Sequence, residues 1–199
     1  MQEVMLFPLS SIVLPEGKMR LRVFEARYKR LVVEALKGDG TFGICLFQKQ
    51  ASAENSELSV VGTLVKIVDF EQLDDGLLGI TVTGLHRFMI RKVRTEHDGL
   101  RFAKIEPLAN WPLMPLSKRG ESLSQQLQQV YAQFEQLDEL YDQKFFDDEC
   151  WVSQRWLEIL PLSNKQFDLL ALELDCTVTI EYLSRALIND EQSDLDTRL

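Results

Sequence analysis

Residues 19–31 read MRLRVFEARYKRL, and the segments on either side of this stretch decide the fold. The short apolar segment Leu6-Phe7-Pro8-Leu9 comes before it, followed by Val13-Leu14-Pro15-Glu16-Gly17, in which proline and glycine mark a turn. The apolar segment Phe42-Gly43-Ile44-Cys45-Leu46 comes after it. The order is therefore a strand, a turn, a charged and aromatic helix start, and a second strand.

The first 110 residues are predicted to form short strands around a single helix. Helical spacing joins Tyr28, Leu31, Val32, Ala35 and Leu36, and Lys37-Gly38 is a plausible helix end. Strands are expected over 42–47 and in two hairpins, which pair 62–70 with 77–83 and 88–94 with 100–106. The polar segment 50–57 is expected to be an exposed loop. This pattern predicts a small, mostly antiparallel β-barrel.

Helices are expected after residues 111–116, where two prolines interrupt the chain and mark a linker. Apolar residues then recur at helical spacing as far as Tyr141. Further helices are predicted from Asp148 to Pro161, from Ser163, where Gln166 completes a capping box, and over 175–188. The sequence therefore predicts an α+β protein with a β-barrel lobe over 1–110, a linker over 111–116 and a helical bundle over 117–199.

Charge and cysteine content limit the classes of function. The chain has a formal charge of −9, and the acidic excess lies in the second part: residues 1–116 hold 15 Lys and Arg against 14 Asp and Glu, whereas residues 117–199 hold 7 against 17. This second part should repel nucleic acid. Cys45, Cys150 and Cys176 form no disulfide framework or metal-ligand pair in sequence. With no secretory signal and no membrane-spanning segment in the sequence, we expect a cytoplasmic protein.

Further short motifs follow the opening stretch in a fixed order: Val61-Gly62-Thr63-Leu64-Val65-Lys66-Ile67, Asp74-Asp75-Gly76, Gly84-Leu85-His86-Arg87-Phe88 and Leu160-Pro161-Leu162-Ser163. Together with residues 6–46, this ordered set resembles the amino-terminal domain of the ATP-dependent protease Lon. The resemblance implies a PUA-like β-barrel followed by a helical bundle, in a domain that engages unfolded polypeptide. The chain departs from the family pattern at Leu14, where Phe is frequent, and at Ala26, where Pro is frequent.

The positions that match the family's motif are expected to be mainly structural: Pro15, Gly17, Phe24, Glu25, Arg27, Tyr28, Phe42, Gly43, Gly62, Gly84, Arg87 and Phe88. Glu25 is expected to satisfy free N–H groups at the helix start, with Arg27 as its ion-pair partner. Arg87 is expected to anchor the bend at Gly84, while Phe88 enters the core.

No catalytic constellation is apparent. The sequence contains no Gly-x-x-x-x-Gly-Lys-Ser/Thr motif for ATP and lacks Lon's proteolytic Ser-Lys segment, so we expect a stand-alone, non-enzymatic form of the domain. His86 and His97 have no neighbouring ligands in sequence, and no metal or cofactor is expected. Asp147-Asp148-Glu149 is interpreted as the start of a helix.

A basic hairpin offers an alternative function. Its basic residues, all within 87–104, are Arg87, Arg91, Lys92, Arg94, Arg101 and Lys104. A PUA-like barrel with such a hairpin would be an RNA-binding module. Apart from Phe88 and Phe102, no aromatic residues are interleaved with these charges for base stacking, which favours a solvated face instead.

The sequence therefore predicts a non-catalytic protein that binds polypeptides, either unfolded clients or a protein partner, as an adaptor or regulator in proteolysis. A hydrophobic groove or an edge strand of the barrel would hold an extended segment. Leu14 and Met19 are the predicted peptide-binding residues. The remaining alternative is an assembly subunit that uses an apolar stripe of the helical part.

Overall fold

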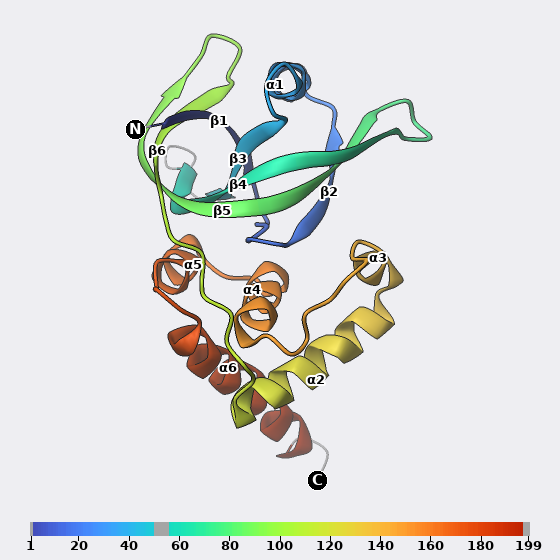
Figure 1. Cartoon of the computed structure of the whole chain (residues 1–199), viewed down its shortest axis with the longest axis vertical. Coiled ribbons are helices and arrows are strands. Elements are labelled where there is room, and N and C mark those ends of the chain that lie inside the picture. Colours follow the sequence, from blue (N-terminus) through green and yellow to red (C-terminus); the bar gives the residue numbers. More distant parts are fainter. Residues whose placement is uncertain (1, 50–55, 197–199) are drawn as a thin grey trace. The chain divides into compact units, whose positions relative to one another are not determined.

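The computed structural model describes residues 2–49 and 56–196. The chain forms two compact units, and we describe each by itself. The strand unit comprises residues 1–110 together with 161–172, and the helical unit comprises 111–160 and 173–199. With six strands and six helices among the described residues, the α+β class predicted from the sequence is confirmed (Figure 1).

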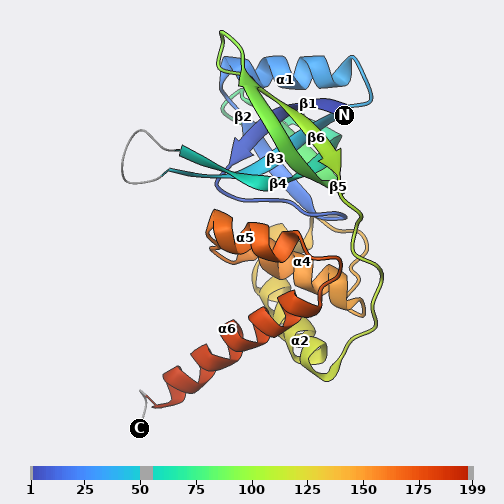
Figure 2. The same cartoon turned by 90° about the vertical axis from the view of Figure 1, so that its left-hand side faces the viewer.

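The strand unit contains six strands and two helices. In chain order these are β1 (Gln2–Leu9), β2 (Lys18–Val23), α1 (Ala26–Leu36), β3 (Thr41–Lys49), β4 (Ser56–Gln72), β5 (Leu78–Thr95), β6 (Arg101–Pro107) and α5 (Asn164–Ala171). The sheet order is β2-β5-β4-β3-β1-β6, and β6 also pairs with β5 (Figure 2). The pairings of β1, β3, β4, β5 and β6 therefore form a closed circuit, while β2 extends it from β5. β1 and β3 are parallel, and the other pairs are antiparallel.

Two strands differ from the sequence-based expectation. β5 is one long strand where two shorter ones were predicted, because it continues through Gly84 from its pairing with β2 and β4 to its pairing with β6. β2 was not predicted, although Leu21 and Val23 alternate with exposed Arg20 and Arg22. Period-two alternation is typical of a strand with one buried face. The predicted loop over 50–57 lies mostly outside the described residues.

The core of the strand unit surrounds Phe88. Its ring packs directly over two strands, because Gly43 and Gly62 carry no side chain. A Cβ added at Gly43 would lie 2.9 Å from the Phe88 Cζ atom, and one added at Gly62 would lie 2.6 Å from it. Buried Leu6 and Ile105 belong to the same cluster. A residue larger than glycine at either position would displace the ring from the core.

Helix α5 belongs to the strand unit, although the sequence-based division placed it with the other helices. The Asp168 carboxylate accepts hydrogen bonds at 3.1 Å from the backbone N–H groups of Val60 and Val61, and another from the Ser59 hydroxyl. The Gln48 side chain donates to the Leu162 carbonyl at 3.0 Å. These bonds attach residues 161–172 to β3 and β4. The predicted capping box of this helix, Ser163 with Gln166, is present.

The helical unit contains α2 (Lys118–Gln133), α3 (Glu135–Asp138), α4 (Glu149–Ile159) and α6 (Thr177–Asp196). Helices α2, α4 and α6 contact one another (Figure 1). The helix predicted to run as far as Tyr141 is interrupted at Phe134, which has non-helical φ and ψ values of −115° and 83°. Because the chain turns there, Tyr141 packs against Tyr131 and Trp151, with ring centroids 5.8 and 5.9 Å apart. No helix among the described residues is long and apolar enough to cross a membrane.

Candidate binding groove

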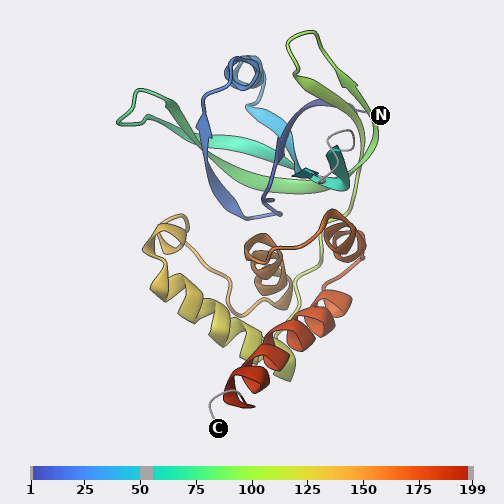
Figure 3. The ribbon, with the colours of Figure 1, turned by 180° about the vertical axis from the view of Figure 1, so that it is seen from behind.

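A groove of about 430 Å³ opens on the strand unit beside the start of α1. Its walls come from the end of β1, the middle of β2, the β2–α1 turn, the first turn of α1, and one residue each from β3 and β6. Figure 3 shows β2 leading into α1. The lining residues are Phe7, Pro8, Leu9, Arg20, Leu21, Arg22, Phe24, Glu25, Arg27, Tyr28, Phe47 and Arg101.

The groove lies where the strand pairings are interrupted. β6 pairs with β1 along Gln2–Leu6, so Phe7, Pro8 and Leu9 are paired on the β3 side alone among the described residues. β2 pairs as a strand with β5 alone in the same part of the chain. The end of β1 and the edge strand β2 therefore both contribute to the groove without sharing a ladder. Such a place can accept an additional extended segment.

The floor of the groove is aromatic. Tyr28 of α1 stacks on Phe7 of β1, with ring centroids 3.9 Å apart and planes inclined by 19°. Burial raises the pKa of the Tyr28 hydroxyl, so this ring stays neutral at physiological pH. Phe24, at the rim, is 63% exposed. A large exposed ring beside an apolar floor is a typical anchor for an apolar ligand side chain.

Glu25 and Arg27 form the ion pair expected from the sequence. Arg27 Nη2 lies 2.7 Å from Glu25 Oε2, and Arg27 Nη1 donates to the Gly99 carbonyl at 3.2 Å. Glu25 is the N-cap residue of α1, yet its side chain makes no cap hydrogen bond. The expected capping of free N–H groups by this carboxylate is therefore wrong, because the carboxylate is directed to Arg27 instead.

Four family-motif residues, Phe24, Glu25, Arg27 and Tyr28, line the groove. The other eight lie elsewhere. Pro15 and Gly17 form a turn tied to Gly84, while Phe42, Gly43, Gly62 and Phe88 lie in the core. The expected role of Arg87 at the Gly84 bend stays a prediction, and Arg87 itself is buried. It donates to the carbonyls of Ala109 and, at 2.6 Å, of Ala171.

The two residues predicted to bind peptide do not line the groove. Leu14 is 1% exposed, and its carbonyl oxygen accepts a hydrogen bond from the N–H of Gly17 inside the turn. It therefore presents no surface to a ligand in this structure. Met19 is half-buried on β2, one position from Arg20. The groove is lined on β2 by Arg20, Leu21 and Arg22, and Met19 is not among its lining residues.

The basic hairpin predicted as an RNA-binding face does not form one cluster of available charge. Arg87 is buried, Arg91 donates to Glu106 at 2.7 Å, and Arg94 bonds to Glu3 and Glu96 at 2.8 and 2.9 Å. Arg101 lies in the groove over the Phe47 ring instead. Carboxylates thus neutralise much of this face, which favours its interpretation as a solvated surface.

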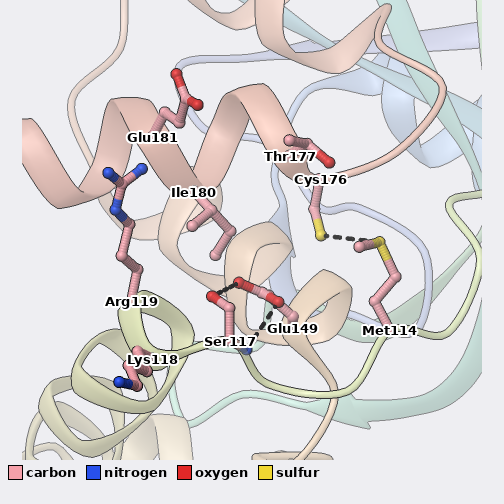
Figure 4. A pocket seen from close by; sticks show the side chains of 9 residues that line it. All are labelled: Met114, Ser117, Lys118, Arg119, Glu149, Cys176, Thr177, Ile180 and Glu181. Carbon is pink, nitrogen blue, oxygen red and sulfur yellow. Dashed lines mark hydrogen bonds between the residues drawn. The ribbon is translucent and has the colours of Figure 1, made fainter.

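The helical unit has a cavity of its own, of about 370 Å³ (Figure 4). Buried Glu149 lies beside it and holds the start of α2. Its carboxylate accepts from the Ser117 hydroxyl at 2.6 Å and from the Ser117 N–H at 3.1 Å, while Ser117 Oγ accepts from the Gly120 N–H at 3.2 Å. These partners account for the polar atoms of Glu149, so we assign it a structural role. Among the described residues, no three His, Cys, Asp or Glu side chains meet to hold a metal ion.

Two cysteines that are 26 residues apart meet in the helical unit. The Sγ atoms of Cys150 and Cys176 lie 2.9 Å apart, and Cys176 points toward Met114 in the cavity (Figure 4). The hydrogen bond with Cys176 lowers the pKa of the Cys150 thiol. Burial raises the pKa of Cys45 in the strand unit to about 12. The sequence-based analysis missed this pair, because spacing alone does not bring the two residues together.

We expect the azo oxidant diamide to join Cys150 to Cys176 and to leave Cys45 reduced. The Cys150 thiolate and the Cys176 thiol form one S–S bond, and diamide takes up two electrons and two protons to become the hydrazine. Peptide mass mapping after denaturing alkylation should find alkyl groups on Cys45 alone. The matched variant Cys150→Ser should keep both remaining thiols alkylatable. Oxidation chiefly to disulfide-linked dimers would contradict the expectation.

A groove lined by the end of one strand and by an edge strand of an α+β chain is typical of a binding domain. The chain belongs to the family of the ATP-dependent protease La (LON) substrate-binding domain, whose model matches residues 3–183. The resemblance seen in the sequence is thereby confirmed.

Two solved structures are similar to this chain. One is a Lon N-terminal domain protein from Xanthomonas campestris, with 29% sequence identity, a TM-score of 0.71, and coverage of 92% of this chain and 97% of that one. The other is the N-terminal domain of a Mycobacterium avium complex Lon protease, with 13% identity, a TM-score of 0.54, and coverage of 92% and 96%. At 13% identity, the second likeness shows the fold alone.

Proposed function

We propose that this chain is a non-catalytic module that binds extended polypeptide segments in the groove beside α1. The observation that carries the proposal is the aromatic floor with the exposed Phe24 ring, placed where the end of β1 and the edge strand β2 share no ladder. An apolar side chain of the ligand would cover Phe24 and Tyr28, and its backbone would run along β2. The family's substrate-binding description supports a polypeptide ligand.

The proposal extends to the architecture and the biological role. We interpret the strand circuit as a PUA-like barrel that presents the groove, and the helical unit as a bundle. The 199 residues contain no ATP-binding motif, so their activity would be binding itself. As an adaptor or regulator in proteolysis, the protein would hold a client or present it. We place this role in the cytoplasm, because its cysteines are free thiols, which persist in reducing compartments.

The test is a titration of the full chain with a fluorescently labelled, permanently unfolded protein. We expect saturable binding that Phe24→Ser weakens about tenfold, since full burial of a Phe side chain contributes about 1.5–3 kcal/mol. Phe70→Ser is the matched control, because Phe70 is 66% exposed on β4 and lies outside the groove. Equal losses for both variants, or no saturable binding, would refute the groove as the polypeptide site.

A further inference from the structure

We propose that the groove selects acidic segments, in which a large apolar side chain is flanked by Asp or Glu. This inference specifies the ligand class of the groove and rests on the function proposed above. Four arginines line the groove: Arg20, Arg22, Arg27 and Arg101. The single carboxylate among the lining residues is Glu25, which pairs with Arg27.

Arg101 is the clearest cation for a ligand. Elsewhere on β5 and β6, Arg91 and Arg94 bind carboxylates of the same unit. Arg101 lies over the Phe47 ring, with its Cζ atom 5.6 Å from the ring centroid, and makes no ion pair with any residue that the structure describes. Its guanidinium is thus held in place by an aromatic face while its N–H donors stay available to a carboxylate.

The other arginines place the excess charge around the aromatic floor. Arg22 forms an ion pair with Asp75, which does not line the groove, and Arg27 is paired with Glu25. The lining of the groove thus holds four guanidinium groups, from β2, α1 and β6, and one carboxylate, that of Glu25. Because guanidinium groups bind carboxylates in a bidentate manner, a ligand gains from acidic residues on either side of the one that covers Phe24.

A polypeptide fits these features better than a nucleic acid. A nucleic acid carries a charge at every phosphate, whereas residues 1–116, which supply the groove, hold 15 Lys and Arg against 14 Asp and Glu and thus have little excess positive charge for a long polyanion. A peptide with two or three carboxylates confines its charge to the groove and offers an apolar side chain to the Phe7–Tyr28 stack. The two kinds of ligand therefore differ in the charge and in the apolar contacts that they need, and binding experiments can distinguish them.

Three labelled twelve-residue peptides test the inference by fluorescence anisotropy with the full chain. Each has the same two phenylalanines, flanked by aspartates in the first peptide, asparagines in the second and lysines in the third. At 50 mM NaCl we expect the aspartate peptide to bind about tenfold more tightly than the asparagine peptide, and the lysine peptide most weakly. The difference should shrink at 300 mM NaCl, because salt screens the exposed charges.

Variants of the protein locate the effect. Arg101→Gln should weaken the aspartate peptide about threefold and leave the affinity for the asparagine peptide unchanged. Arg20→Gln, at an exposed position of β2, serves as a second variant in case Arg101→Gln perturbs the packing around Phe47. Arg91→Gln is the matched control, since Arg91 lies outside the groove and is paired with Glu106. We expect it to bind all three peptides as the parent chain does.

Each alternative result has a separate meaning. Equal affinity for the aspartate and asparagine peptides would overturn the acidic preference and leave the proposed function standing. A single-stranded RNA of the same length that binds more tightly than the aspartate peptide, and competes with it, would overturn the peptide assignment. If neither the peptides nor the unfolded protein binds saturably, the proposed function itself fails.

Discussion

The variant Gly84→Ala should lower the free energy of unfolding of the strand unit by about 3 kcal/mol or more. A Cβ at position 84 would lie 2.7 Å from the carbonyl carbon of Leu14 and closer still to its oxygen. The turn cannot move away, because the Glu16 N–H donates to the Gly84 carbonyl at 2.9 Å and the Gly84 N–H donates to the Gly17 carbonyl at 2.8 Å. The added methyl group would break this attachment.

Urea unfolding followed by far-UV circular dichroism measures the loss. All three tryptophans lie in the helical unit, so tryptophan fluorescence reports that unit separately. Gly38→Ala is the matched control, because its added Cβ would meet nothing closer than the Ala35 oxygen at 3.5 Å. We expect that variant to stay within about 1 kcal/mol of the parent. Equal stability of the two variants would mean that the turn is not fixed against β5.

The variant Glu158→Gln should destabilise the helical unit by about 3–5 kcal/mol. The Arg155 side chain is fully buried and that of Glu158 is 12% exposed. Arg155 Nε lies 2.8 Å from Glu158 Oε2, and Nη2 donates to Oε1 at 2.9 Å. Burial acts to lower the pKa of Arg155, yet the neighbouring carboxylate raises it above its ordinary value, so the guanidinium stays charged. Removing the opposite charge leaves a buried cation without its carboxylate.

Tryptophan fluorescence during urea unfolding measures this second effect, since Trp151 lies against Arg155. Glu181→Gln is the control: Glu181 and Arg185 are 3.8 Å apart with side chains 51% and 80% exposed. The free energy of unfolding of this control should fall by no more than about 0.5 kcal/mol, because exposed ion pairs contribute little. Combining Arg155→Met with Glu158→Leu should recover most of the stability. A Glu158→Gln loss no larger than the control's would show that the pair is solvated.

Local signals in the sequence predicted the elements that depend on local chemistry. The spacing from Tyr28 to Leu36 predicted α1, and Ser163 with Gln166 predicted the start of α5. β2 was missed because its alternating pattern lies next to the helix start and was interpreted as part of it. The break at Phe134 was missed because helical spacing continues across it. The packing of Tyr141 against Tyr131 and Trp151 decides where the helix ends.

The groove was predicted in part. The motif from Phe24 to Tyr28 supplies one wall and was identified from the sequence. Phe7, Phe47 and Arg101 come from β1, β3 and β6, and only the strand topology brings them to that wall. The Cys150–Cys176 pair has the same origin, since contacts between distant segments follow from packing and not from spacing. Leu14 was predicted to bind peptide as an apolar turn residue, whereas it is buried in a turn that is hydrogen-bonded to Gly84 of β5.

The attachment of α5 to β3 and β4 has a consequence for recombination between relatives. The chain leaves the strand unit after residue 110, returns for 161–172, and leaves again, so neither unit is a continuous stretch of sequence. In a chimera joined at residue 110, residues 1–110 would come from one relative and residue 168 from the other. The backbone N–H groups of residues 60 and 61, which here donate to the Asp168 carboxylate, would then face a residue from the other relative. Exchange of the groove between family members should therefore succeed when residues 161–172 are exchanged together with residues 1–110.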